Sequence, residues 1–327
     1  MARRQLTLFP NQPERPEDIS KSTPLAATLD LFAKYLQREG KSEYTIKAFV
    51  GDLKLLEDDY LEGIRRLSDF LIGDVTTTIL NEFLDWMEHA RIDKNGHRVP
   101  CTRKTYARRV TSLKVYFKWL HQIGALGHDP AKALIQRSGP APLSHALDIE
   151  QIQAGIHAAR QAMKGEQIDA RPELLFSLLL QTGIKKGEAS RLTLADLDRM
   201  NPDAPAIIIR YKAKDVYKER RLTLEPGILP LLDRYMAQYM PQQYLFTCTA
   251  RNLEYILTDI GKEAGIPFKL SFEVMRWTCA LRDHLSGLDD ETIREKLGLS
   301  RPSWYETGQK LRQLATLQAR TSPKNLS

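Results

Sequence analysis

A cluster of basic residues between positions 101 and 120 is the first feature of the sequence that could do chemistry. The stretch CTRKTYARRVTSLKVYFKWL contains no aspartate or glutamate, and two tyrosines, Tyr106 and Tyr116, are interleaved with its cations. Lysine and arginine side chains on a helix supply phosphate contacts in many DNA-binding proteins. We therefore predict phosphate contacts, with a merely solvated charged face as the alternative, from Arg103, Lys104, Arg108, Arg109, Lys114 and Lys118.

The overall composition fits a soluble protein with a polyanionic partner. In 327 residues, 48 lysines and arginines exceed 41 aspartates and glutamates, which gives a formal charge of +7. Such an excess favours nucleic acid without proving it. No apolar run approaches the roughly 20 residues that span a bilayer. Residues 1–24 are polar and contain prolines, without the apolar core of a secretion signal, so we expect a disordered arm on a cytoplasmic, nucleoid-associated protein.

The cysteines argue against a metal site and against a disulfide framework. Cys101, Cys248 and Cys279 are far apart and form no CxxC pair, and the histidines have no metal-ligand spacing. We therefore expect no metal and no small-molecule cofactor.

Residues 25–134 are predicted to form an all-helical domain. Apolar residues recur at helical spacing in LAATLDLFAKYLQREG, where Gly40 ends the helix, and Ser42 is placed to cap the next one. Two further helices are expected at TTTILNEFLDWMEHA and over the basic stretch at 101–124. In the last of these, Val110, Leu113 and Phe117 are predicted to face the core.

A break in the helical pattern separates this domain from a second one. The stretch 128–148 contains three prolines and predicts an interdomain linker over residues 135–148. Residues 149–320 then combine several helices with one hairpin, in which two β-rich runs flank a polar turn within AIIIRYKAKDVYKERRLTL. The predicted fold class is mainly α, with a helical domain, a mixed α+β domain with a small β-hairpin sheet, and a flexible tail at 321–327.

One segment of the second domain resembles a known family. QTGIKKGEASRLTLADLD is similar to the TGLRxxEhhxLxxxDhD pattern that opens the catalytic domain of tyrosine recombinases, the phage integrase family. Glu188, Leu192 and Asp196 match this pattern, and we expect the two acids to buttress it. The similarity extends from about residue 25 to 312, and residues 25–134 look like the family's SAM-like core-binding domain. The resemblance implies a two-domain protein that binds duplex DNA.

The chemistry of this family identifies the positions to compare. A tyrosine hydroxyl attacks a DNA phosphodiester and forms a 3′-phosphotyrosyl link, while arginine and lysine donors rather than a metal stabilise the developing charge. The resemblance places Arg276 at the second arginine and Lys185 at the first, where lysine keeps the charge but loses the two-pronged fork. The family also uses a lysine on the hairpin, and we assign this role to Lys214. Lys212 and Lys218 are the alternatives, and we predict that a lysine without this role contacts DNA.

Three further positions depart from the family pattern. Glu273 stands where a histidine is usual, and its carboxylate would repel a phosphate. Leu299 replaces a donor and can donate nothing. Gly308 occupies the usual place of the tyrosine, while Tyr305 lies three residues earlier, about 4.5 Å along a helix axis. Tyr305 is therefore either a displaced nucleophile or, with Trp304, an aromatic anchor for the C-terminal segment.

These features together predict a DNA-binding member of the tyrosine recombinase family. We expect it to clamp duplex DNA between its domains and to serve DNA recombination or integration, as part of a mobile genetic element, with strand cleavage weakened or lost. One alternative is an active, divergent site-specific recombinase that attacks through Tyr305. Another is a non-catalytic assembly partner of another recombinase. The expected partners are double-stranded DNA and either further copies of the chain or another recombinase subunit.

Overall fold

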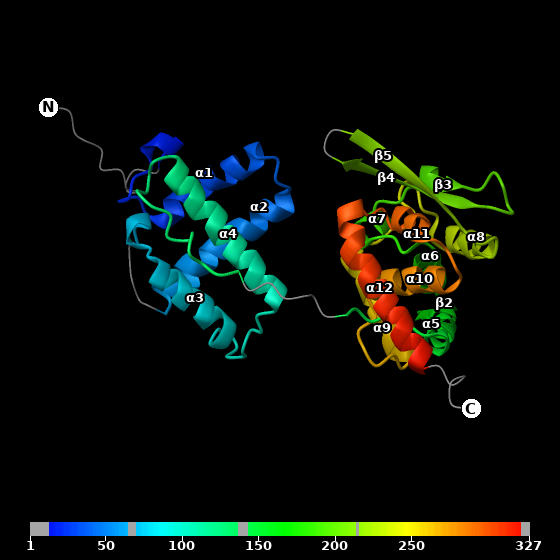
Figure 1. Cartoon of the computed structure of the whole chain (residues 1–327). Coiled ribbons are helices and arrows are strands. Elements are labelled where there is room, and N and C mark those ends of the chain that lie inside the picture. The colour runs from blue at the N-terminus through cyan, green and yellow to red at the C-terminus, as the bar shows by residue number, and fades with distance from the viewer. Residues whose placement is uncertain (1–12, 65–69, 137–142, 214–215, 322–327) are drawn as a thin grey trace. The chain divides into compact units, whose positions relative to one another are not determined.

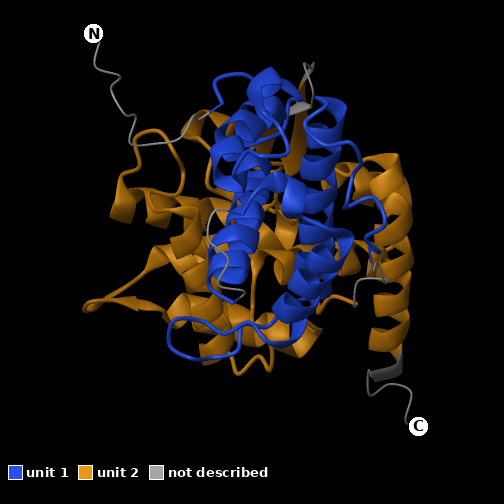
Figure 2. Ribbon diagram, turned by 90° about the vertical axis from the view of Figure 1, so that its left-hand side faces the viewer, with its two compact units in different colours: residues 1–141 blue, residues 142–327 orange. Residues whose placement is uncertain are grey.

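The computed structural model describes residues 13–64, 70–136, 143–213 and 216–321 (Figure 1). The chain divides into two compact units, residues 1–141 and 142–327, which Figure 2 colours separately. Each unit has its own apolar core. The predicted fold class is confirmed, since helices dominate and the strands form small antiparallel sheets.

Unit 1 is helical over most of its described residues. Short turns η1 (Pro16–Asp18) and η3 (Ile72–Asp74) and a π-helical segment η2 (Leu55–Glu62) accompany the longer helices. Those helices are α1 (Leu25–Arg38), α2 (Glu43–Lys54), α3 (Thr77–His89) and α4 (Arg103–Gln122).

Local sequence signals explain where these helices begin and end. The side chains of Ser42, Thr76 and Thr102 each accept a hydrogen bond from a backbone N–H in the first turn that follows, which satisfies a donor that has no partner within the helix. Gly40 ends α1 with φ +69°, a conformation that side chains with a Cβ rarely adopt. The predicted inward face of α4 is also confirmed, since Val110, Leu113 and Phe117 are fully buried.

The residues that precede α1 differ from the expected disordered arm. Residues 1–12 lie outside the described part of the chain, but residues 13–24 pack onto unit 1. Ile19 is 5% exposed and belongs to the core of the unit, and Pro24 forms a β-bridge with Leu71. One buried isoleucine among polar residues was too weak a signal to predict this packing.

A buried carboxylate joins α2 to α4. Asp52, 4% exposed, accepts hydrogen bonds from Arg108, from Arg109 Nε at 3.3 Å and from Ser112 Oγ at 2.7 Å. Arg108 also donates to the carbonyl of Ala48. These bonds fix α2 on α4 where the two helices cross.

Unit 2 combines a helical core with two small sheets. Its helices are α5 (Ile149–Gln161), α6 (Ala170–Thr182), α7 (Lys186–Ala189), α8 (Ile228–Tyr239), α9 (Ala250–Glu263), α10 (Phe272–Leu285), α11 (Asp290–Lys296) and α12 (Arg301–Thr321), with a 3-10 turn η4 (Leu194–Asp196). Helix α6 is buried on most sides and packs against α5, α8 and α10.

The predicted hairpin supplies two strands of a three-stranded antiparallel sheet. The strands, in their order across the sheet, are β3 (Leu197–Asp198), β4 (Ala206–Ala213) and β5 (Val216–Thr223). Ala213 pairs with Val216, and Ile207 and Ile209 face Leu222 and Arg220 across the ladder. A second hairpin, β1 (Met163–Lys164) with β2 (Gln167–Ile168), was not predicted. Each of its strands has two residues, too few for a period-2 pattern.

We predict that Asp52→Asn destabilises unit 1 by about 3 kcal/mol, because it leaves the buried guanidinium of Arg109 without a countercharge. Chemical denaturation would measure the loss. The matched control is Asp59→Asn, which breaks the more exposed pair with Arg91 and should cost at most about 1 kcal/mol. Equal stability of the two variants would contradict the role of Asp52.

Candidate nucleic-acid interface and catalytic site

A cationic cluster in unit 2 contains two of the predicted site residues. Arg276, on α10, donates from one amino nitrogen to the carbonyl of Gly183 at 2.7 Å and from the other to the carbonyl of Leu297. Burial lowers the pKa of Arg276 to about 10, and attraction to Glu188 only partly offsets that effect. The side chain remains charged at neutral pH and is fixed by two backbone carbonyls.

Lys185 lies beside Arg276, at the start of the short helix α7. Partial burial of its ammonium group lowers the pKa of Lys185, and the positive charges of Arg276 and Arg220 lower it further. The structure therefore brings Lys185 and Arg276 into electrostatic contact, as the resemblance implied. It adds a third cation, Arg220, which was not predicted.

Arg220, on β5, binds both oxygens of Glu188. The distances are 3.1 Å from Nη1 to Oε1 and 2.8 Å from Nη2 to Oε2, a bidentate pair of which both side chains are about 10% exposed. Burial alone would raise the pKa of Glu188, but hydrogen bonds from Arg220 and from the backbone N–H of Lys185 outweigh it and lower the pKa. Glu188 thus has the predicted buttressing role, and so does Asp196, which accepts from Thr193 N at 2.9 Å.

A sequence signal for Arg220 existed. Side chains two apart on a strand share a face, and Leu222 and Leu224 were obvious core residues of the hairpin. The same parity turns Arg220 inward, where an arginine requires an acidic partner. That partner, Glu188, is separated by 32 residues, so local spacing could not identify it.

The hairpin lysines are only partly described. Lys214 lies outside the described residues. Lys212 has its backbone in β4, but its side chain is also outside the described part. Lys218 is exposed on β5, opposite Tyr211 and two residues from Arg220, so it shares the face of the strand that carries Arg220.

No hydrogen bond among the described residues joins Tyr305 to this cluster. Tyr305 lies on α12 with 73% of its surface exposed, and its hydroxyl has no hydrogen bond to the described part of the chain. The aromatic-anchor interpretation is therefore wrong for Tyr305 and right for its neighbour Trp304, which packs against the small core around Leu297 and Leu311.

The other three positions that depart from the family pattern each contact neighbouring residues. Leu299 packs against the same small core as Trp304. Gly308 is buried, and a Cβ at this position would lie 3.2 Å from Trp304 Cε2. Glu273 is exposed in the first turn of α10, with Ser144 Oγ 3.5 Å from its carboxylate. Position 308, where the resemblance places the tyrosine, is thus covered by the indole ring of Trp304.

Unit 1 presents four of the six predicted DNA contacts on one helix face. At 3.6 residues per turn, these four lie within an arc of about 100° on α4. We name them the basic stripe: Arg103, Lys104, Lys114 and Lys118, of which Lys114 is half-buried and the others are exposed.

The remaining predictions for α4 need correction. Arg109 is 9% exposed, and it shares the carboxylate of Asp52 with Arg108. The countercharge missing from 101–120 is therefore supplied by α2. Tyr106 and Tyr116 are buried, and the hydroxyl of Tyr116 pairs with that of Thr28 at 2.6 Å, so neither ring lies on the surface.

Helices α2 and α4 begin on the same side of unit 1 (Figure 1). Their capping hydroxyls, Ser42 and Thr102, lie at the two N-termini, where the helix dipole adds partial positive charge. Arg103 and Lys104 of the basic stripe belong to the first turn of α4. This end of unit 1 is therefore suited to phosphate groups.

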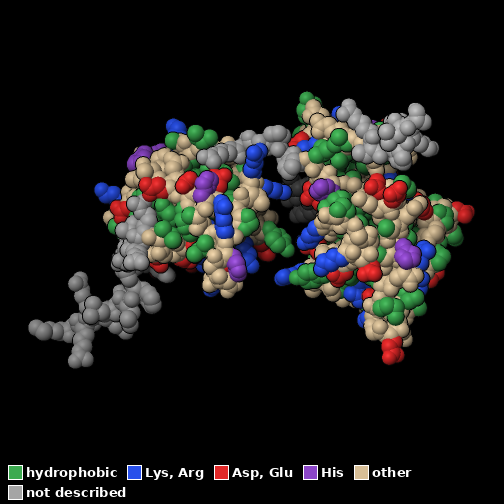
Figure 3. Space-filling view, turned by 90° about the horizontal axis from the view of Figure 1, so that it is seen from below, with side chains coloured by type: hydrophobic (Ala, Val, Ile, Leu, Met, Phe, Trp, Pro, Cys, Tyr) green, Lys and Arg blue, Asp and Glu red, His purple; other side chains and the backbone are tan. Residues whose placement is uncertain are grey.

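Net charge alone does not define a binding face. On the face shown in Figure 3, lysine and arginine side chains are interspersed with acidic ones among the coloured residues. Within the described ranges, no group of three or more His, Cys, Asp or Glu side chains could hold a metal ion. None of the helices searched in those same ranges is long and apolar enough to cross a membrane.

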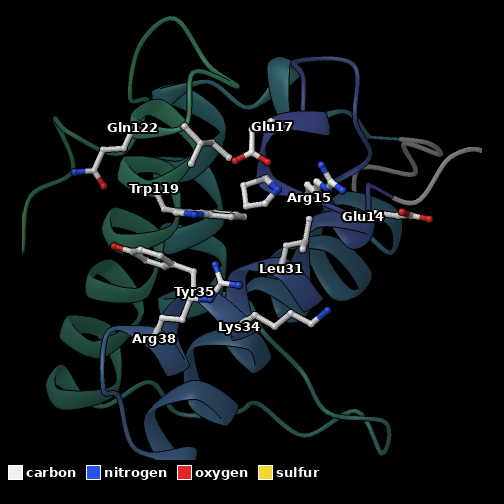
Figure 4. Close-up of a pocket in the computed structure, with 11 residues that line it drawn as sticks. Glu14, Arg15, Glu17, Leu31, Lys34, Tyr35, Arg38, Trp119 and Gln122 are labelled. Carbon is white, nitrogen blue, oxygen red and sulfur yellow. The ribbon is translucent and has the colours of Figure 1, made fainter.

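A cavity of about 540 Å³ in unit 1 lies apart from the basic stripe (Figure 4). Tyr35 and Trp119 line it and stack at 5.8 Å between ring centroids. Arg15, Arg38 and Glu17 also line it, so it carries both charge signs. We assign it to imperfect packing of the N-terminal residues on α1 and α4.

Comparison with known proteins identifies the family. The model of the phage integrase family matches residues 146–306, and that of the phage integrase N-terminal SAM-like domain matches residues 29–124. The chain belongs to the phage integrase family of tyrosine recombinases.

Curated relatives agree with this result. Tyrosine recombinase XerC of Mycobacterium sp. (strain KMS) is 28% identical over 176 residues, which are 53% of this chain and 55% of the relative, so the match spans about half of its length. Tyrosine recombinase XerC of Lacticaseibacillus casei (strain BL23) is 24% identical over 291 residues, 84% of this chain and 89% of the relative.

Solved structures share the fold. XerH site-specific recombinase bound to palindromic difH substrate, in a post-cleavage complex, has a TM-score of 0.67 at 15% identity, covering 93% of this chain and 97% of that one. A lambda integrase dimer bound to a COC′ core site has a TM-score of 0.66 at 14% identity, covering 89% and 78%.

We predict that Gly308→Tyr lowers the free energy of unfolding of unit 2 by about 1–3 kcal/mol, because the new side chain must displace the indole of Trp304. Thermal and chemical denaturation would measure the loss. The control adds Gly308→Tyr to a Trp304→Ala background, where the site is open and the same change should cost much less. Equal costs in both backgrounds would contradict the indole's occupation of this place.

Proposed function

We propose that this protein binds duplex DNA through phosphate contacts from both units, as part of DNA recombination or integration, with strand cleavage weakened or lost. The observation that carries the proposal is the grouping of Lys185 and Arg276 in one cationic cluster, while Tyr305 is exposed and no hydrogen bond among the described residues joins it to that cluster. Binding of a phosphate requires the two grouped cations. Cleavage of a phosphodiester requires those cations and also a nucleophile beside them.

The charge of the cluster in unit 2 supports anion binding. Three cations, Lys185, Arg220 and Arg276, interact with one carboxylate, Glu188, which leaves a net charge of +2. The lowered pKa of Lys185 indicates that burial and this excess destabilise the ammonium in the free protein. A phosphate beside Lys185 would relieve the repulsion.

The basic stripe supports binding by unit 1. Its four side chains have no acidic partner among the described residues, unlike Arg108 and Arg109. They lie along one face of α4, and Arg103 and Lys104 stand in its first turn, next to the capping residue Thr102. Charges that are free and share a face can contact successive phosphates.

Weakened cleavage is supported by the residues at three family positions. Leu299 offers no donor for a phosphorane oxygen, Glu273 offers a negative charge, and Gly308 is covered by Trp304. Stabilisation of developing charge commonly contributes more than any other effect to such catalysis. Loss of donors should therefore reduce cleavage far more than binding.

One observation favours an active recombinase as the second candidate. The Tyr305 hydroxyl is exposed and has no partner within the described residues, so nothing described blocks an attack on DNA that lies along α12. This candidate requires other groups to replace the missing donors.

The proposal includes association with a further copy or another recombinase subunit on DNA. The lambda integrase structure similar to this chain is described as a dimer on a core site. Here α12 packs on α10 and α11 of its own chain. Experiment is needed to identify the surface that binds a partner.

We predict that Lys104→Gln/Lys118→Gln weakens binding to a double-stranded oligonucleotide and lowers the slope of log affinity against log salt by about 2, since each phosphate contact contributes about 0.9. Fluorescence anisotropy over a salt series would measure both. Lys94→Gln/Lys132→Gln removes the same charge from exposed sites elsewhere in unit 1 and should change the slope much less. Equal slopes for the two variants would exclude the basic stripe.

A further inference from the structure

Every nitrogen of the Arg220 guanidinium donates a hydrogen bond inside unit 2. Its Nη1 and Nη2 donate to Glu188, and its Nε donates to the carbonyl of Lys296 at 3.1 Å. The side chain is 11% exposed. Most of its N–H donors therefore hold neighbouring groups of unit 2.

The first of these groups leads to Lys185. Glu188 Oε2 accepts from Arg220 Nη2 and also from the backbone N–H of Lys185, both at 2.8 Å. Arg220 orients the carboxylate, and the carboxylate fixes the backbone at Lys185. Within the four-residue helix α7, the carbonyl of Lys185 accepts from the backbone N–H groups of Glu188 and Ala189, so the Glu188 carboxylate supplies the bond to its N–H.

The second group leads to Arg276. Arg220 binds the carbonyl of Lys296, and Arg276 binds that of the next residue, Leu297. Both arginines thus hold the C-terminal end of α11. The following residue, Gly298, has φ +60°, and a Cβ there would lie 2.6 Å from Arg220 Nη1. Glycine is therefore required at 298 for this approach.

We propose that Arg220 is a positioning residue of the phosphate site, which sets Lys185 through Glu188 and shares the end of α11 with Arg276. The inference rests on the proposed function for its phosphate, but the positioning itself can be measured without DNA. Neither Lys185 nor Arg276 is held in this arrangement by contacts within its own helix alone.

The sheet supplies a matched control pair. Arg221 is the next residue on β5, faces the other side of the sheet and pairs with Asp198 of β3. Arg221→Lys and Asp198→Asn therefore repeat the changes Arg220→Lys and Glu188→Gln in the same sheet, away from Lys185.

The first measurement is hydrogen–deuterium exchange of the Lys185 amide in the DNA-free protein. Arg220→Lys keeps the charge but loses the fork, so this amide should exchange about tenfold faster, while Arg221→Lys should leave it unchanged. Unchanged exchange in Arg220→Lys would overturn the positioning role.

The second measurement is affinity for a double-stranded oligonucleotide. If Glu188 acted only through its charge, Glu188→Gln would strengthen DNA binding, because a negative charge near phosphate is removed. Positioning predicts the opposite, about tenfold weaker binding, with Asp198→Asn unaffected. Glu188→Gln also tests the positioning role if Arg220→Lys does not fold.

A third variant separates this inference from the proposed function. Weak binding by Lys185→Ala together with normal binding by Arg220→Lys and Glu188→Gln would overturn the positioning role alone. Normal binding by Lys185→Ala would contradict the phosphate site itself, and with it the role of Arg220 there.

Discussion

Three cationic side chains in unit 2 interact electrostatically with a single carboxylate. Glu188 binds Arg220 through both oxygens and the backbone of Lys185 through one of them, while Arg276 is fixed on two carbonyls nearby. Like charges at such sites are costly without compensation, and one acid among three cations compensates only in part. The remaining positive charge makes this place suited to a phosphate.

The cationic cluster and most of the positions that depart from the family pattern lie in different parts of unit 2. The cationic cluster involves α7, α10, β5 and the end of α11, whereas two of the three altered family positions, Leu299 and Gly308, lie at α12 and its small core. Trp304 and Leu299 pack there as ordinary apolar residues. The apolar packing of Leu299 and Trp304 therefore involves other contacts than those that group the cations.

Sequence reasoning succeeded where the signal was local. Helix starts such as Ser42, the inward face of α4 and the hairpin follow from patterns within a few residues. It failed where partners are distant along the chain, because Asp52 neutralises Arg108 across 56 residues and Glu188 meets Arg220 across 32. The exposure of Tyr305 beside a packed Trp304 likewise depended on how α12 docks, which spacing alone does not determine.

The central claim is that the protein retains DNA binding while strand cleavage is weakened or lost. Duplexes selected for binding to this protein, nicked at successive positions so that cleavage traps the enzyme, test it most directly. The account predicts bound complexes with little or no covalent product on denaturing gels. A protease-sensitive covalent adduct formed in high yield, and abolished by Tyr305→Phe at unchanged affinity, would contradict it.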